Sequence, residues 1–133
     1  MKNLVILEKT GTGYSAYVPH LPGCVSTGKN ISEIKTNIEE AVEFHIEGMR
    51  DEGLRLPEGF HEGYSLMFKM DIASLFAWFS GVLTKSGVSR ITGLNPSLIS
   101  QYASGIKTPS TKQTRKIEKA LHRLGEELLE IKL

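Results

Sequence analysis

Hydrophobic positions alternate along two parts of the chain, one at the start and one just before residue 70. Alternation of apolar and polar residues, bounded by Gly and Pro, is typical of a half-buried strand. Gly11-Thr12-Gly13 adds a turn signal inside the first alternating part. The pattern predicts four strands, over residues 2–9, 14–18, 24–27 and 64–70.

Between the third and fourth predicted strands, apolar residues recur at spacings of three and four, which predicts an amphipathic helix. Asn30 can cap its start, with Glu33 three residues on as in a capping box, and Gly53 ends it. We expect this helix to pack on one face of a small antiparallel sheet, in the order β-β-β-α-β. Its apolar stripe consists of Ile31, Ile34, Ile38, Ala41, Val42, His45 and Met49.

After Met70 the hydrophobic period changes from two to 3.6 and remains helical to the end of the chain. Asp71 can cap a helix that contains Leu75, Phe76, Trp78 and Phe79. The fold class is therefore predicted as α+β. We expect an N-terminal β-β-β-α-β domain over residues 1–70 and an all-α domain over residues 71–133.

Residues 86–110 have the pattern of two short helices joined by a tight turn. Gly93 suits a turn that needs positive φ, and Leu94 can fill the gap between the helices. Asn95 is a strong N-cap, followed by Pro96 at the first helical position. Gly105 predicts the end of the second helix. Periodicity alone would fit either an amphipathic helix of an ordinary helical bundle or a DNA-binding domain. The spacing of Gly93, Ile99, Gly105 and Pro109 around one turn favours a helix-turn-helix DNA-binding domain.

The second of these helices has an apolar side with Leu98, Ile99 and Tyr102, and an opposite side of short polar residues. A helix that enters the major groove needs such a polar face. Gln101 can make a bidentate contact to adenine, and Lys107 just after the helix is placed for a phosphate. The candidate DNA-binding residues are Pro96, Ser97, Ser100, Gln101, Ser104 and Lys107.

The last helix is predicted from Ser110, with Gln113 completing a capping box and Gly125 interrupting or bending it. Its apolar stripe could be domain core or the seam of a dimer, and both interpretations stay open. A basic stripe beside it could be a solvated face or add attraction to phosphates. The apolar stripe consists of Ile117, Leu121, Leu124, Leu128 and Ile131, and the basic stripe of Lys112, Lys116, Lys119 and Arg123.

The net charge of +1 hides two oppositely charged halves. Residues 1–70 carry seven basic and ten acidic residues, a net charge of −3, and residues 71–133 carry nine and five, a net charge of +4. A basic half suits phosphates, and an acidic half suits a basic protein.

Neither a signal peptide nor an apolar run of about 18 residues stands in the sequence, so we expect a cytoplasmic protein without membrane association.

Catalytic interpretations of the first half are weak. A metal-dependent nuclease needs several clustered carboxylates, and the predicted strands offer only Glu8. Cys24 with His20 or His45 lacks an orienting third group, so it is interpreted as a small buried residue. His61 beside Glu62 provides too few ligands for a metal. We therefore expect no enzyme activity, no metal and no cofactor.

Residues 93–110, GLNPSLISQYASGIKTPS, resemble the second half of a Cro/repressor-type helix-turn-helix, and about 50 residues share this resemblance. It implies that Pro96, Ser97 and Gln101 face bases, and that Ser104 and Lys107 lie near the phosphate backbone. Pro96 is a departure, because it offers no side-chain hydrogen bond and could only contact a thymine methyl. Base readout would then rest on Ser97 and Gln101.

Residues 13–42 resemble the HicB antitoxin family. The resemblance is carried by a Gly-Tyr pair, a Pro-His-Leu-Pro-Gly-Cys segment, a Ser-Thr-Gly turn and an acidic helix. It implies a partial RNase H-like domain without nuclease activity that masks a small basic mRNA-cleaving toxin of the HicA type. His20 and Lys29 depart from the family, since acidic residues are frequent at both positions.

Together these patterns predict an antitoxin that binds a HicA-type toxin and represses its own operon by binding operator DNA, as a homodimer or higher homo-oligomer. The alternative is a transcriptional regulator whose N-terminal domain only oligomerises or senses a ligand. A nucleic-acid-processing enzyme is a further, weaker alternative.

Overall fold

The computed structural model describes residues 2–133, with side chains from Asn3 onward. The chain forms two compact units, Met1–Ser74 and Leu75–Leu133. A mixed four-stranded sheet with one long helix precedes a region of four helices, which makes the fold α+β, as the hydrophobic pattern predicts.

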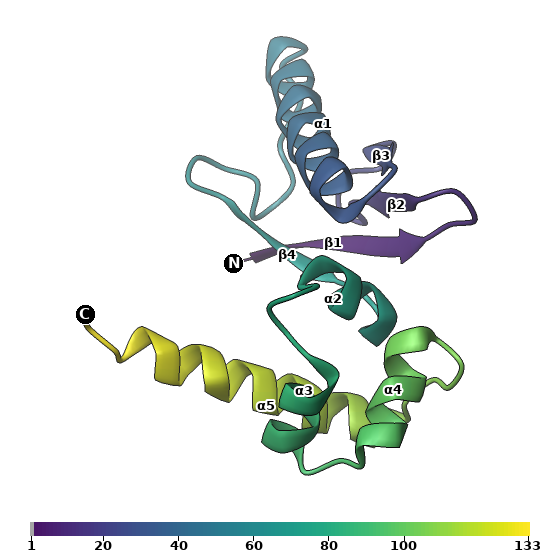
Figure 1. Cartoon of the computed structure of the whole chain (residues 1–133). Helices are drawn as coiled ribbons and strands as arrows, with labels where there is room; N and C mark the ends of the chain where they lie inside the picture. Colours follow the sequence, from purple (N-terminus) through teal and green to yellow (C-terminus); the bar gives the residue numbers. More distant parts are fainter. Residues whose placement is uncertain (1) are drawn as a thin grey trace. The chain divides into compact units, whose positions relative to one another are not determined.

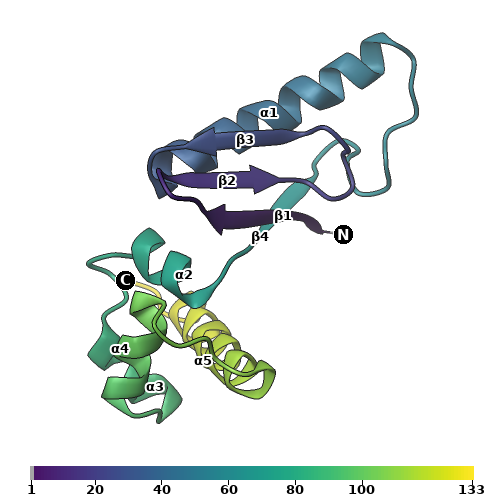
Figure 2. The ribbon, with the colours of Figure 1, turned by 90° about the vertical axis from the view of Figure 1, so that its right-hand side faces the viewer.

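The sheet of the first unit has the order β3-β2-β1-β4 (Figure 2). The pairs β1–β2 and β2–β3 are antiparallel, whereas β4 runs parallel to β1, with Val5 opposite Phe68. The expectation of an antiparallel sheet is therefore wrong for β4. A helical crossover separates β4 from the first three strands, and such a connection returns the chain in the same direction. The strands are β1 (Lys2–Lys9), β2 (Tyr14–Tyr17), β3 (Val25–Gly28) and β4 (Ser65–Lys69).

Helix α1 (Ile31–Asp51) covers one face of this sheet (Figure 2). Its start is capped as predicted, because the Asn30 Oδ1 atom accepts a 2.8 Å hydrogen bond from the Glu33 N–H. Ile46 is buried and His45 is only half-buried, so the predicted apolar stripe was wrong at this turn. The buried side of the helix consists of Ile31, Ile34, Ile38, Val42 and Ile46.

Two close approaches fix the sheet against its surroundings. Gly28 ends β3 so near the first turn of α1 that a Cβ atom there would lie 2.6 Å from the Ile34 nitrogen. The buried Asn3 side chain donates to the carbonyl oxygens of Gly59 at 2.5 Å and Ser65 at 3.3 Å. Asn3 thus ties the loop after α1 to the central strand.

The second part of the chain contains α2 (Ile72–Trp78), α3 (Lys85–Thr92), α4 (Pro96–Ser104) and α5 (Thr111–Leu129) (Figure 1). Helix α3 packs against both α4 and α5. The Asp71 carboxylate accepts a 2.7 Å hydrogen bond from the Ser74 N–H at the start of α2, as predicted. Helix α5 continues through Gly125 without interruption, so the predicted break there was wrong. The core shared by α3, α4 and α5 is formed by Val88, Leu94, Ile99, Tyr102 and Ile117.

Candidate functional site

The turn between α3 and α4 is built from three residues. Gly93 has φ 74° and ψ 7°, a left-handed conformation that costs glycine little. Leu94 is buried between the two helices, and Asn95 caps α4 by accepting a 2.8 Å hydrogen bond from the Ser97 N–H. Each of these roles matches the sequence prediction. The turn therefore holds α4 against α3 with a filled gap and a satisfied helix start.

Two buried hydroxyl groups of α3 hold this turn, and the sequence prediction did not include them. Ser89 Oγ donates to the Leu94 carbonyl oxygen at 2.5 Å. Thr92 Oγ1 donates to the Val88 carbonyl oxygen at 2.6 Å and accepts from the Leu94 N–H at 3.2 Å. The peptide groups of Leu94 are thereby paired inside the core, where an unpaired group would be costly. The only sequence signal was the presence of short hydroxyl residues within an apolar helix pattern.

Helix α4 has one buried side and one polar side. Ile99 and Tyr102 are buried as predicted, while Leu98 is half-buried and belongs to the edge of the core. Gly105, with φ 79°, ends the helix, and its N–H donates to the Tyr102 carbonyl oxygen at 3.2 Å. The helix is therefore short, anchored by two large side chains, and capped at both ends.

The candidate DNA-binding residues lie along the outer side of α4 and in the segment after it. Ser100 is half-buried, at the margin of this surface. The other five, which are exposed, are Pro96, Ser97, Gln101, Ser104 and Lys107. We call these six residues the polar face. Four of the five polar-face residues on α4 are short (Pro96, Ser97, Ser100 and Ser104), and the major groove of DNA, about 12 Å wide, admits an α-helix.

The segment that follows α4 is fixed to it by hydrogen bonds to Gln101. The Gln101 carbonyl oxygen accepts from the Lys107 N–H and from the Ser104 hydroxyl, both at 3.2 Å. The hydroxyl proton of Ser104 is therefore used in a hydrogen bond within α4. Ile106, between these anchors, is 80% exposed and was not predicted as a surface residue of interest. The Ile106 side chain therefore adds an apolar contact surface beside the polar face.

Helix α1 presents an acidic face away from the sheet. Glu40, Glu43 and Glu47 are all exposed on it. Phe44 stands among them and is 80% exposed, and Gly48 one turn later has no side chain to cover it. Burial, and next the Glu43 carboxylate, raise the pKa of the Tyr64 phenol. We call Glu40, Glu43, Phe44 and Glu47 the acidic face.

The alternative of a cysteine nucleophile finds no support in the surroundings of Cys24. The side chain is buried, and desolvation raises the pKa of the Cys24 thiol. A raised pKa leaves little of the reactive thiolate. His20 is exposed. Cys24 instead belongs to a tight turn, in which its N–H donates to the Leu21 carbonyl oxygen at 2.9 Å.

Within residues 2–133, no three His, Cys, Asp or Glu side chains gather in a way that could hold a metal ion. Over the same range, every helix is too short or too polar to cross a bilayer.

Comparison with known sequences gives matches to part of the chain. An uncharacterized 14.9 kDa protein of Haemophilus phage HP1 is 44% identical over 54 residues, which are 41% of this chain and 41% of the phage protein. A UPF0150 protein of Helicobacter pylori is 49% identical over 41 residues, which are 31% of this chain and 57% of that protein. The chain thus spans less than two thirds of the length of either relative.

A UPF0150 protein of Thermoplasma acidophilum is 40% identical over 58 residues, 43% of this chain and 84% of the relative. Among solved structures, a chain of the "HicA3 and HicB3 toxin-antitoxin complex" has 38% identity, covers 39% of this chain and 60% of its own length, and gives a TM-score of 0.37.

The sequence profile of the family described as HicB-like antitoxin of bacterial toxin-antitoxin system matches residues 3–71. These residues include the whole sheet apart from Lys2, together with α1 and the acidic face. The match covers more than half of the 133 residues. The chain therefore belongs to the HicB-like antitoxins of bacterial toxin–antitoxin systems.

Proposed function

We propose that the chain is an antitoxin with two binding activities. Its N-terminal part binds and masks a small, basic, mRNA-cleaving toxin of the HicA type, and its C-terminal helices bind the operator of its own operon. The observation that carries the first activity is the family match over residues 3–71. In this proposal the N-terminal unit is a partial RNase H-like domain without nuclease activity, and the chain acts in the cytoplasm. The β-β-β-α-β order supports this assignment.

The acidic face of α1 is the surface that we propose for the toxin. Between Lys35 and Arg50 this helix carries no Lys or Arg, so a basic partner meets a negatively charged surface. Phe44 supplies an apolar anchor at its centre, and exposed aromatic side chains are frequent energetic centres of protein interfaces. The acids of residues 1–70 other than Glu8 lie on α1 or in the loop after it, which suits binding better than catalysis.

For the second activity, we propose that α3, the Gly93 turn and α4 form a helix-turn-helix. The buried anchors of α4 and its outward polar face support this proposal. Ser97 and Gln101 would read base edges, Pro96 would contact a thymine methyl, and Ser104 and Lys107 would lie on the phosphates. Ser100 lies at the margin of the polar face and would make an additional base contact.

The test is co-expression of the full chain with a small basic protein of the HicA type. The proposal predicts that the chain restores growth, co-purifies with that protein and retards a DNA fragment from its own promoter. If the chain retards this DNA but neither restores growth nor co-purifies, it is a lone transcriptional regulator. If it restores growth and binds no DNA, only the proposal for α3 and α4 fails.

A further inference from the structure

Ile106 is an exposed apolar side chain beside the polar face. It follows Gly105 at the end of α4 and is 80% exposed, although isoleucine is among the residue types most often buried in proteins. Within residues 96–110, which the structure describes throughout, no other large apolar side chain is exposed. One aliphatic side chain is therefore presented to solvent among short polar residues and Lys107.

The backbone on both sides of Ile106 is held in place by hydrogen bonds to α4. Before it, the Gly105 N–H donates to the Tyr102 carbonyl oxygen at 3.2 Å. After it, the Lys107 N–H donates to the Gln101 carbonyl oxygen, also at 3.2 Å. A β-branched side chain has few rotamers, so it loses little freedom when it makes a contact. Ile106 therefore has a fixed position relative to Gln101, the residue proposed to read a base edge.

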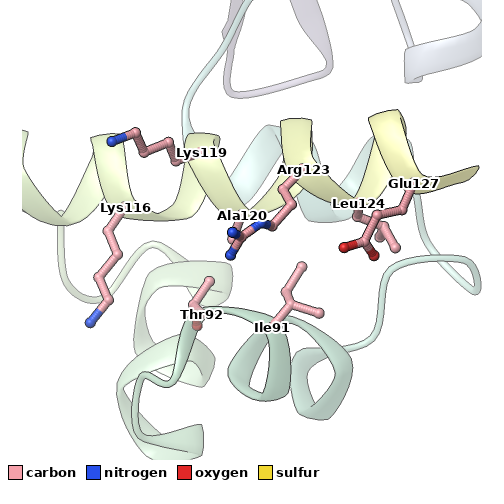
Figure 3. A pocket seen from close by; sticks show the side chains of 8 residues that line it. All are labelled: Ile91, Thr92, Lys116, Lys119, Ala120, Arg123, Leu124 and Glu127. Carbon is pink, nitrogen blue, oxygen red and sulfur yellow. The ribbon is translucent and has the colours of Figure 1, made fainter.

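Other apolar residues of the C-terminal helices gather at a separate place. Ile91 and Leu124 line a hollow of about 550 Å³ where α3 faces α5, with Arg123 beside them (Figure 3). Ile106 is not among the residues that line this hollow. The centre of a protein–protein interface consists of several adjacent apolar side chains. A single aliphatic side chain with polar neighbours is therefore a poor match for a protein partner.

DNA offers one apolar group that a single isoleucine can cover. In the major groove the base edges present hydrogen-bond donors and acceptors, and thymine adds a C5-methyl group. Isoleucine has no polar side-chain atom, so on DNA it gains affinity by removing apolar surface from water. Pro96, for which a thymine methyl is also proposed, lies at the other end of α4, and nine helical residues span about 14 Å. One methyl group cannot touch both residues, so Ile106 requires a thymine of its own.

We propose that Ile106 contacts the C5-methyl group of one thymine in the operator and makes this base pair a determinant of specificity beyond those read by Ser97 and Gln101. This inference rests on the proposed DNA binding by α4 and adds a residue outside that helix. Loss of the methyl group leaves no polar group unpaired. The expected preference is therefore about threefold to sixfold, the effect of burying one methyl group.

The test uses the full chain and a DNA fragment from its own promoter, in which footprinting locates the binding site. Each thymine of the site is replaced in turn by deoxyuridine, which lacks only the methyl group, and gel retardation at one salt concentration gives the affinity. We expect one replacement to weaken binding of the wild-type chain about threefold to sixfold. The same replacement should leave binding of Ile106→Ala unchanged, because this variant has already lost the contact.

Two further variants are controls. Ile106→Val keeps a β-branched aliphatic side chain and should retain the response to that deoxyuridine. Thr108→Ala removes another exposed side chain of the same segment and should respond to every replacement as the wild-type chain does. Because Ile106 and Thr108 are exposed, none of the three variants should lower the midpoint of thermal unfolding, which circular dichroism measures.

The outcomes separate this proposal from the one on which it rests. If Ile106→Ala loses affinity equally for every fragment, random DNA included, the side chain contacts the sugar-phosphate backbone and the proposal is overturned. It is also overturned if Ile106→Ala binds the operator as tightly as the wild-type chain, or if both respond to the same replacements. In these cases DNA binding by α4 stands and only the role of Ile106 is lost. If the wild-type chain retards no DNA, both proposals fail.

Discussion

The Ser89 hydroxyl lies 2.5 Å from the carbonyl oxygen of Leu94 and donates to it across the turn between α3 and α4. Both residues are buried. Water therefore cannot replace this hydrogen bond without opening the core. This hydrogen bond joins α3 to the residue that fills the turn, directly before the N-cap of α4.

Ser89→Ala should destabilise the C-terminal unit by about 1–3 kcal/mol, because the Leu94 carbonyl would stay buried without a partner. The free energy of unfolding can be followed in urea by the fluorescence of Trp78, the one tryptophan of the chain. Ser104→Ala is the matched control, since its hydroxyl is exposed, and we expect a change within about 0.5 kcal/mol. Equal effects of the two substitutions would contradict the role given to Ser89.

Gly28→Ala should destabilise the N-terminal unit. The new methyl group would lie 2.6 Å from the Ile34 nitrogen and 2.8 Å from its Cα atom, so β3 or the first turn of α1 must move. Overpacking of this kind costs about 1–3 kcal/mol. The midpoint of urea unfolding, followed by circular dichroism, measures it.

Gly48→Ala is the control for this substitution. Gly48 lies within α1, and a Cβ atom there has open space around it. Alanine is the better helix former, so this variant should be more stable by about 0.5–1 kcal/mol. Two alanine variants that shift stability in the same direction would refute the steric argument for Gly28.

Local signals in the sequence were sufficient for most helix ends. Asn30, Asp71 and Asn95 each accept the predicted N-terminal hydrogen bond, and Gly93 and Gly105 end their helices with positive φ. These features depend on neighbours within three or four residues, which a sequence pattern records directly.

Features that depend on distant neighbours were not predictable. The parallel direction of β4 follows from the crossover through α1, and the alternation of apolar residues is the same in either direction. The hydrogen bond from the Ser89 hydroxyl to the Leu94 carbonyl oxygen can form only when the turn between α3 and α4 has folded. Ile46 is a different case, because it follows Val42 at the spacing of four that the rest of the stripe has, and the sequence therefore favours it over His45 for the buried side.

Gln101→Ala should weaken binding to the specific operator by about 1–3 kcal/mol and leave binding to random DNA nearly unchanged. The reason is that Gln101 is exposed on the polar face, where its amide can pair with an adenine edge. Titration of both DNA fragments at one salt concentration measures the difference. Lys107→Ala is the contrasting variant, because loss of a phosphate contact lowers affinity for both fragments equally. An equal loss on both fragments for Gln101→Ala would show that this residue does not read sequence.

Cys24 should react slowly with a disulfide reagent in the folded protein and rapidly after denaturation. Burial raises the pKa of its thiol above the unfolded value, so the folded state holds the proton more tightly. The free energy of unfolding should accordingly be unaffected by pH below the pKa that the thiol has in the unfolded chain. It should fall as pH rises from that pKa toward the higher pKa of the thiol in the folded protein. The rate of this reaction at pH 7 and at pH 9 is measured by the absorbance of the thiolate that the reagent releases. Rapid labelling at neutral pH without unfolding would reopen the interpretation of Cys24 as a nucleophile.

Phe44→Ala should weaken toxin binding without destabilising the antitoxin. The ring is 80% exposed in the unbound chain, so its removal leaves no cavity, whereas an anchor at the centre of an interface contributes about 2 kcal/mol or more. Calorimetric titration with the purified toxin gives the affinity, and thermal unfolding of the free chain gives the stability. Leu54→Ala, at another exposed apolar residue outside the acidic face, is the control and should leave the affinity unchanged.

The charges around Phe44 can be tested in the same way. Reversal of Glu40 and Glu47 to lysine should slow association with a basic toxin and reduce the dependence of the rate on salt, because long-range attraction acts mainly on the encounter. Reversal of Glu58 and Glu62, which lie in the loop after α1, changes the net charge equally and is the matched control. If both pairs slow association to the same extent, only the net charge of the chain attracts the toxin. If neither pair nor Phe44→Ala has an effect, the toxin binds elsewhere than on the acidic face.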